Sequence, residues 1–195
     1  MRGSDINIDI TRKCTLKCRH CYNHSGEMNN DELASDELFR IMNDLASTRP
    51  DNFCICGGEP LLKKEIIFRF IDHQKKINSE MNIGMVTNGE LLTESIGEKL
   101  IYYGLNNIQF SIDGATENSH DWLRNKKGLF ENLLHTIMQL NILRRKAKSD
   151  IKISAVCCLN KRNYEELPKI IELCTRLGID ILRVQPLMKM GIKKG

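Results

Sequence analysis

Short apolar runs alternate with amphipathic helical patterns along almost the whole of this 195-residue chain. Strand–helix repeats of this kind build a parallel sheet covered by helices. Right-handed crossovers then curl such a sheet in one direction. We therefore predict an α/β fold, a partial, open (β/α)6 TIM-like barrel in which no helix follows the last strand. The predicted strands are residues 6–10, 52–56, 82–86, 107–112, 151–157 and 181–184.

Local signals mark the ends of two of the predicted helices. Ser35 is expected to cap the helix whose apolar face carries Leu38 and Met42. Thr93 is expected to cap the helix after the third strand. Gly104 is expected to end that helix, because glycine readily adopts the left-handed conformation that closes a helix.

The composition is that of an ordinary globular protein and excludes several classes. A net charge of +4 and an aromatic content of 6% offer little for nucleic-acid binding. No stretch approaches the roughly 18 apolar residues of a membrane span, so we expect no membrane partner. Eight cysteines without an apolar export signal predict a protein of the reducing cytoplasm.

Three cysteines, Cys14, Cys18 and Cys21, follow the first predicted strand with C-x3-C-x2-C spacing. The catalytic and ligand-binding residues of α/β folds lie at the carboxyl ends of the strands. A cubane iron–sulfur cluster usually takes four cysteines, so three predict a 4Fe–4S cluster with one iron open to another ligand. A zinc site with His20 as fourth ligand is an alternative, and a disulfide framework would need an oxidising compartment.

The chain resembles the radical S-adenosylmethionine (radical SAM) enzyme family, whose signature is this cysteine spacing after the first strand of a partial barrel. The resemblance covers residues 5–191. The same series of motifs recurs in a branch of peptide and cofactor maturases that often carries a C-terminal cysteine-rich SPASM or twitch domain. The further motifs are Gly57-Gly58-Glu59-Pro60, Thr87-Asn88-Gly89, Ser111-Ile112-Asp113-Gly114, His120-Asp121-Trp122-Leu123-Arg124 and Gly128-Leu129-Phe130.

The resemblance assigns cofactor-binding roles to the motifs after the second and third strands. It implies that the backbone of Gly57 and Gly58 contacts the amino group of the methionine moiety, and that Glu59 helps to hold this loop. Paired glycines at a strand end let a ligand approach the backbone closely. Asn88 is a further candidate for the cofactor site, although its motif is also typical of a plain turn before a helix.

The resemblance also assigns roles after the fourth strand. Ser111 and Asp113 are two apart and face the same side of a strand, and the resemblance implies contact with the ribose or methionine end of the nucleoside. A strand-end turn with a capping aspartate is the alternative. Arg124 resembles the arginine that pairs with the methionine carboxylate, which a guanidinium matches through two hydrogen bonds. A surface arginine is the alternative there.

The resemblance implies one radical SAM core domain over residues 1–195, without the last helix and without a C-terminal auxiliary-cluster domain. It implies reductive cleavage of S-adenosylmethionine at the cluster to a 5′-deoxyadenosyl radical. That radical would abstract hydrogen from a peptide or protein substrate, with an external one-electron donor such as ferredoxin or flavodoxin. The alternatives are biosynthesis of haem-type or other cofactors, and a non-catalytic iron–sulfur or zinc protein.

The other five cysteines are expected to pack as small apolar residues. Cys54 and Cys56 lie two apart in a strand and share a face, so Cys56 could line the cavity. Cys157 and Cys158 are adjacent and point to opposite faces. Cys174 falls on an apolar helical stripe and is expected in the core.

Overall fold

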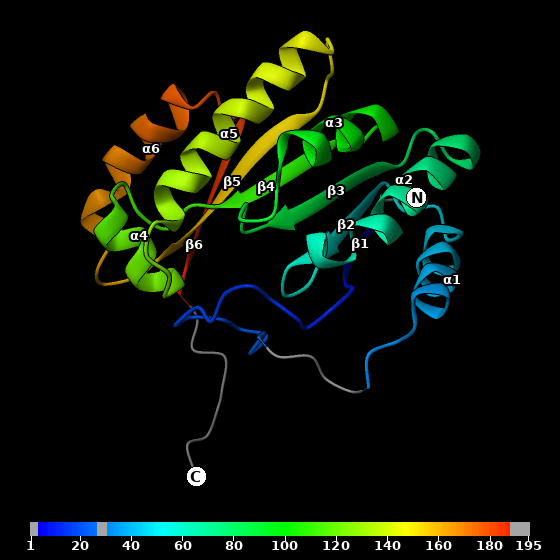
Figure 1. The fold of residues 1–195 in the computed structure, drawn as a ribbon, viewed down its shortest axis with the longest axis horizontal. Helices are drawn as coiled ribbons and strands as arrows, with labels where there is room; N and C mark the ends of the chain where they lie inside the picture. Colours follow the sequence, from blue (N-terminus) through cyan, green and yellow to red (C-terminus); the bar gives the residue numbers. More distant parts are fainter. Residues whose placement is uncertain (1–3, 27–30, 188–195) are drawn as a thin grey trace.

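Six parallel strands form one curled sheet in the order β1-β2-β3-β4-β5-β6. The computed structural model describes residues 4–26 and 31–187, so the end of the family resemblance at 188–191 lies outside the described residues. The predicted α/β open barrel is confirmed (Figure 1). Its strands are β1 (Asp5–Asp9), β2 (Asn52–Cys56), β3 (Asn82–Thr87), β4 (Asn107–Ser111), β5 (Lys152–Leu159) and β6 (Ile181–Pro186).

The helices cover the outer face of the sheet (Figure 1). Two short 3-10 turns, η1 (Pro60–Lys63) and η2 (Tyr164–Glu166), precede α2 and α6. The helix α4 was not predicted. It contains the His120-Asp121-Trp122-Leu123-Arg124 motif, to which the sequence analysis assigned no secondary structure. The helices are α1 (Ser35–Ala46), α2 (Lys64–Ile77), α3 (Glu94–Tyr103), α4 (Glu117–Arg124), α5 (Leu129–Lys146) and α6 (Leu167–Arg176).

The hydrophobic core lies between this outer face and the helices. Alternate strand residues point into it, and Phe53, Ile83 and Ile108 are fully buried there. The opposite face carries polar residues that are partly open, such as Asn7 and Gln109. The inner face of the half-barrel is therefore available to a ligand.

The predicted helix ends are confirmed in one case and wrong in another. The Thr93 hydroxyl accepts a hydrogen bond from the backbone N–H of Ile96, and Gly104 ends α3 with a φ of 89°. At α1, however, Ala34 and not Ser35 occupies the capping position. The Glu37 carboxylate accepts a bond of 2.9 Å from the Ala34 N–H, so an acidic side chain in the first turn performs the capping.

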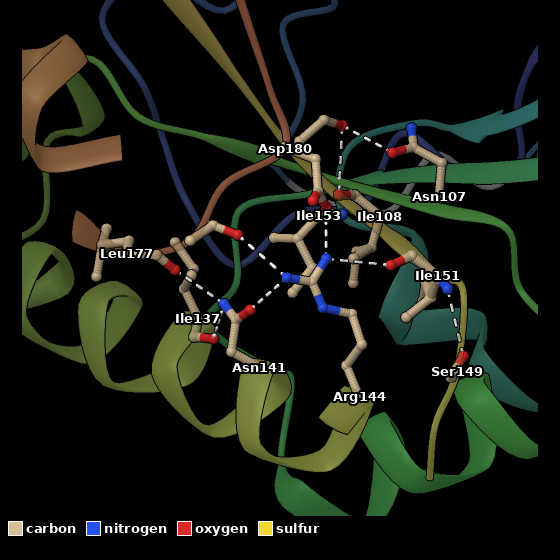
Figure 2. Close-up of polar contacts among 12 residues, drawn as sticks. Asn107, Ile108, Ile137, Asn141, Arg144, Ser149, Ile151, Ile153, Leu177 and Asp180 are labelled. Carbon is tan, nitrogen blue, oxygen red and sulfur yellow. Dashed lines mark hydrogen bonds and ion pairs between the residues drawn. The ribbon is translucent and has the colours of Figure 1, made fainter. Parts of the chain in front are cut away.

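A polar network anchors the amino ends of β5 and β6 to α5 (Figure 2). The Arg144 guanidinium pairs with Asp180 and donates to the Asn141 side chain. The Asp180 carboxylate accepts from the Ile153 N–H at 2.8 Å, and Asn141 donates to the Leu177 carbonyl at 2.8 Å. This network lies at the end of the barrel opposite the strands' carboxyl ends, so its role is structural.

The sixth strand forms the far edge of the sheet. In the part of the chain that the structure describes, β6 pairs with β5 alone. Its residues Ile181 and Val184 are 54% and 42% exposed. None of the described helices combines the length and apolarity that crossing a bilayer requires.

Candidate functional site

The cysteine loop begins where β1 ends and is fixed there by the glycine pair that follows β2. The Gly58 N–H donates to the Thr11 carbonyl at 2.7 Å, and the Glu59 N–H donates to the Lys13 carbonyl at 2.9 Å. A Cβ on Gly58 would lie 2.3 Å from the Lys13 oxygen, and Gly57 has a φ of 150°. Glycine is therefore required here, because the two backbones touch.

The far part of the loop is tied to α4. The Arg19 N–H donates to the Leu123 carbonyl at 2.9 Å, and its side-chain Nε donates to the Trp122 carbonyl at 2.9 Å. The guanidinium also lies 4.9 Å from the centre of the Trp122 ring. Figure 1 shows this dark-blue loop beside α4 and the carboxyl ends of the strands. The loop is held at both ends.

Backbone N–H groups of the loop point at two of the three sulfurs. The Leu16 N–H donates to Cys14 Sγ at 3.4 Å. The Ser25 N–H donates to Cys21 Sγ at 3.3 Å. Such bonds stabilise a thiolate more than a thiol, because they place positive hydrogen against negative sulfur. They are the environment that cluster-bound thiolates use.

Side chains from other elements also reach the sulfurs. Asn88 Nδ2 lies 3.8 Å from Cys14 Sγ and donates to the Thr15 hydroxyl at 3.1 Å. Arg124 Nη1 lies 3.9 Å from Cys18 Sγ. Burial nevertheless raises the pKa of both Cys14 and Cys18, so these thiols need a cation, such as the iron of a cluster, to become thiolates.

A single metal ion does not fit the three cysteines. Among the described residues, no three His, Cys, Asp or Glu side chains converge closely enough to hold one ion. Zinc needs its sulfurs about 2.3 Å from one point, whereas a cubane binds each thiolate on a different iron. His20 Nε2 is paired with Asp113, whose Oδ2 lies 3.5 Å away. The donor set fits a cluster better than zinc.

Glu59, which directly follows the glycine pair, is buried and accepts three hydrogen bonds. Its carboxylate accepts hydrogen bonds from the Leu61 N–H at 3.1 Å, the Thr87 hydroxyl at 2.8 Å and the Asn88 N–H at 2.9 Å. Burial raises its pKa, although these donors oppose the shift. Glu59 therefore holds the ends of β2 and β3 together, as expected for a residue that supports the loop.

Asp113 and Arg124 form a buried ion pair next to Cys18. Arg124 Nη2 lies 2.6 Å from Asp113 Oδ2, and the two side chains are 12% and 0% exposed. Asp113 lies two residues beyond the end of β4, and its Oδ1 accepts from the Cys158 N–H at 2.7 Å. Arg124 Nε is buried without a hydrogen-bond partner among the described residues. Arg124 is thus an internal residue of the site and not a surface arginine.

His120 is a residue of the site that sequence analysis quoted but gave no role. Its Nδ1 accepts from the Asp113 N–H at 3.2 Å. Burial, with Arg124 nearby, lowers its pKa to about 3. Its neighbour Asp121 accepts from the Phe130 N–H at 2.8 Å and so fixes the start of α5. The only sequence signal for these roles was the position of both residues in the His120–Arg124 motif.

A cavity of about 430 Å³ opens at the carboxyl ends of the strands. Seven of the ten predicted site residues line it: Cys18, Cys21, Gly57, Asn88, Ser111, Asp113 and Arg124. Cys14, Gly58 and Glu59 lie behind this lining layer. Sequence analysis missed the inner-face residues of the later strands, which alternation along each strand could have identified: Gln109, Val156, Cys158, Arg183 and Gln185.

Comparisons with known proteins agree with this arrangement. The family model described as the radical SAM superfamily matches residues 8–174. The AdoMet-dependent heme synthase of Methanosarcina barkeri is 33% identical over 174 residues, which are 89% of this chain and 47% of the relative. The sporulation killing factor maturation protein SkfB of Bacillus subtilis is 28% identical over 184 residues. These residues are 94% of this chain and 42% of SkfB.

Solved structures show the same fold. SuiB of Streptococcus suis bound to S-adenosylmethionine superposes with a TM-score of 0.78 at 18% identity, over 98% of this chain and 42% of SuiB. SuiB has also been solved with its precursor peptide SuiA, with a TM-score of 0.76, 18% identity and coverage of 96% of this chain and 40% of SuiB. The chain therefore spans less than half the length of these relatives.

Proposed function

The chain belongs to the radical SAM superfamily of enzymes, and from this we propose that it cleaves S-adenosylmethionine reductively and abstracts hydrogen from a peptide or protein. The observation that carries the proposal is the cysteine loop. Two of its sulfurs accept backbone hydrogen bonds, and two line the cavity at the carboxyl ends of the strands.

Cys14, Cys18 and Cys21 would hold a 4Fe–4S cluster. When bound, the cluster and S-adenosylmethionine supply an electron transfer that breaks a carbon–sulfur bond and yields the 5′-deoxyadenosyl radical. The protein would contribute to this reaction by holding the cysteine loop rigid and by keeping water from the site. The Gly58 and Arg19 contacts at the two ends of the loop support this role.

The cofactor would lie in the cavity against Gly57, Asn88 and Ser111. Arg124 Nε has no hydrogen-bond partner among the described residues, which suits the guanidinium to a second carboxylate, that of methionine. In this proposal Asp113 acts by orienting Arg124, because its own two oxygens are already occupied by Arg124 and the Cys158 N–H.

A peptide or protein substrate is favoured by the names of two relatives and by the inner face of the barrel. SkfB is a maturation protein, and MftC of Mycolicibacterium smegmatis is a maturase. Gln109 and Gln185 line the cavity, and side-chain amides can both donate to and accept from a peptide backbone. Haem-type cofactor synthesis is the second candidate, because the heme synthase of Methanosarcina barkeri is 33% identical.

An external one-electron donor such as ferredoxin or flavodoxin would reduce the cluster, and the cytoplasm would be the compartment. All eight cysteines are free thiols in the structure. Free thiols in this number are typical of a reducing compartment.

The central test measures 5′-deoxyadenosine formed under dithionite by anaerobically reconstituted protein. Cys18→Ala should abolish both the iron-dependent absorbance and the product, whereas Cys174→Ala, which removes a core thiol, should retain both. Product formation that persists in Cys18→Ala would refute the cluster assignment. Arg124→Ala should weaken S-adenosylmethionine binding in equilibrium dialysis, and unchanged affinity would remove Arg124 from the cofactor site.

The substrate class is tested by deuterium transfer. Peptide and tetrapyrrole fractions from cells grown in deuterated water are each incubated with the reconstituted enzyme. Deuterium in 5′-deoxyadenosine from the peptide fraction supports the proposal, and deuterium from the tetrapyrrole fraction alone favours the haem-type candidate.

A further inference from the structure

Two thiols outside the cysteine loop face each other on the inner surface of the barrel. Cys54 Sγ and Cys56 Sγ lie 3.6 Å apart on β2. Their strand neighbours Phe53 and Ile55 are fully buried under the helices, so the two thiols project to the opposite face, toward the cavity. Cys56 lines that cavity directly.

These two cysteines differ from the packing cysteines of the core. Cys157 and Cys174 are buried against apolar neighbours, as expected from the sequence. Cys54 and Cys56 are only partly buried. Cys56 lines the cavity, as its place in the strand suggested, and Cys54 lies beside it on the same face of β2.

The surroundings shift the pKa values of the two thiols in opposite directions. The hydrogen bond from Cys56 lowers the pKa of Cys54, and the charge of Arg183 on β6 lowers it further. The same bond raises the pKa of Cys56, with burial and the carboxylate of Asp9 adding to the shift. Asp9 lies opposite Cys56 in the β1–β2 register.

A disulfide between these residues would lie near the upper limit of the usual Cα separations. Residues two apart in an extended strand have Cα atoms about 6.6 Å apart, because each residue advances about 3.3 Å. Disulfides usually span Cα separations of about 4.4–6.8 Å, so the pair lies at the far limit. A bridging atom between the two sulfurs relieves this constraint, since it lets the sulfurs remain near their present separation.

A metal that needs three or four protein ligands also does not fit. Within residues 4–26 and 31–187, no three His, Cys, Asp or Glu side chains could share one ion. Soft ions with low coordination numbers are the remaining class, and thiolates select them.

We propose that Cys54 and Cys56 form a two-thiolate chelate for a soft, thiophilic ion of low coordination number, with monovalent copper as the representative cation. Binding one such ion converts two S–H groups into two sulfur–metal bonds and releases two protons, with no change of oxidation state. The bound ion would lie beside Gly57, at the wall of the cavity. The site is separate from the cysteine loop, and its occupancy does not depend on cleavage of S-adenosylmethionine.

The first test uses phenylarsine oxide, which condenses with two neighbouring thiols to give one bridged adduct and one water molecule. Cluster-loaded protein is treated anaerobically, and the adduct is located by mass spectrometry. We expect one phenylarsenic group bridging Cys54 and Cys56. Cys54→Ser and Cys56→Ser should each lose the adduct, and Cys158→Ser, which removes a cavity thiol without a thiol partner, should keep it.

The second test titrates cluster-loaded protein with Cu(I) buffered by bicinchoninate. Either Cys54→Ser or Cys56→Ser should weaken one Cu(I) site on the order of 100-fold, because a second attached ligand raises affinity by about that factor or more. The matched Cys158→Ser protein should bind as the unaltered protein does. Equal arsenical labelling and equal Cu(I) affinity in all four proteins would overturn the proposal, and circular dichroism verifies that each variant is folded.

Discussion

Acid should destabilise this protein through one buried imidazole, that of His120. The side chain is fully buried, and its Nδ1 accepts from the Asp113 N–H. Burial lowers its pKa from 6.5 to about 3, and the positive charge of Arg124 adds to the shift. The folded protein therefore keeps His120 neutral at a pH where the unfolded chain has already bound a proton.

The sign and size of this change in unfolding free energy follow from the coupling between protonation and folding. A lowered pKa means that the stabilisation is complete above pH 6.5 and is lost as the pH falls toward the folded value. At pH 5.0 the unfolded chain gains about 2 kcal/mol from protonation of this group, against almost nothing at pH 7.5. This result is insensitive to the folded pKa, because pH 5.0 is well above about 3.

The assay is urea unfolding of the protein and of His120→Asn at pH 7.5 and 5.0. Asparagine can offer an oxygen to the Asp113 N–H but does not titrate in this range. Lost packing against Phe130 costs the variant the same at both pH values. The stability advantage of the unaltered protein over His120→Asn should thus shrink by about 2 kcal/mol. An advantage that stays constant within 0.5 kcal/mol would refute the account.

Three further substitutions test how the site is held. Glu59→Gln should cost about 2 kcal/mol in urea unfolding, because an amide NH2 replaces one carboxylate oxygen and cannot accept the bond from Thr87 or from the Asn88 N–H; an unchanged midpoint would contradict this. Gly58→Ala should cost about 3 kcal/mol and lower iron incorporation, since its Cβ meets a backbone oxygen at 2.3 Å; normal iron content would argue against the close approach. Arg144→Met should cost about 1–2 kcal/mol by breaking the network with Asp180, whereas the exposed Arg145→Met serves as control and should change little.

The sequence was sufficient for the sheet and for the place of the cysteine loop, because both depend on local patterns. Alternating apolar runs specify strands, and parallel strands bring their carboxyl ends to one edge. The Cys14–Cys21 loop follows β1, and Gly57 and Gly58 follow β2. Adjacent parallel strands therefore had to place these two segments side by side.

The sequence was insufficient where a role depends on contacts between distant segments. Ser35 was the obvious cap from its residue type, yet Glu37 caps α1 from within the first turn. Asp180 belongs to no recognisable sequence motif, but it links the amino ends of β5 and β6 to Arg144 of α5. Alternation placed Cys54 and Cys56 on one face of β2, but it could not give the 3.6 Å separation of their sulfurs or bring Arg183 of β6 near them.

The charges around the cysteine loop indicate why the ion pair of Asp113 and Arg124 is built into this site. Burial raises the pKa of Cys14 and Cys18, so the loop without a metal favours thiols. Coordination to iron would create thiolates, and Arg124 already lies 3.9 Å from Cys18 Sγ. An unpaired buried guanidinium would itself be costly, and Asp113 removes that cost while leaving Nε unpartnered among the described residues. The pair therefore holds one guanidinium where it could meet both an iron-bound sulfur and a ligand carboxylate, and Asp113→Asn, which loosens the orientation of Arg124, should weaken binding of that carboxylate ligand in equilibrium dialysis.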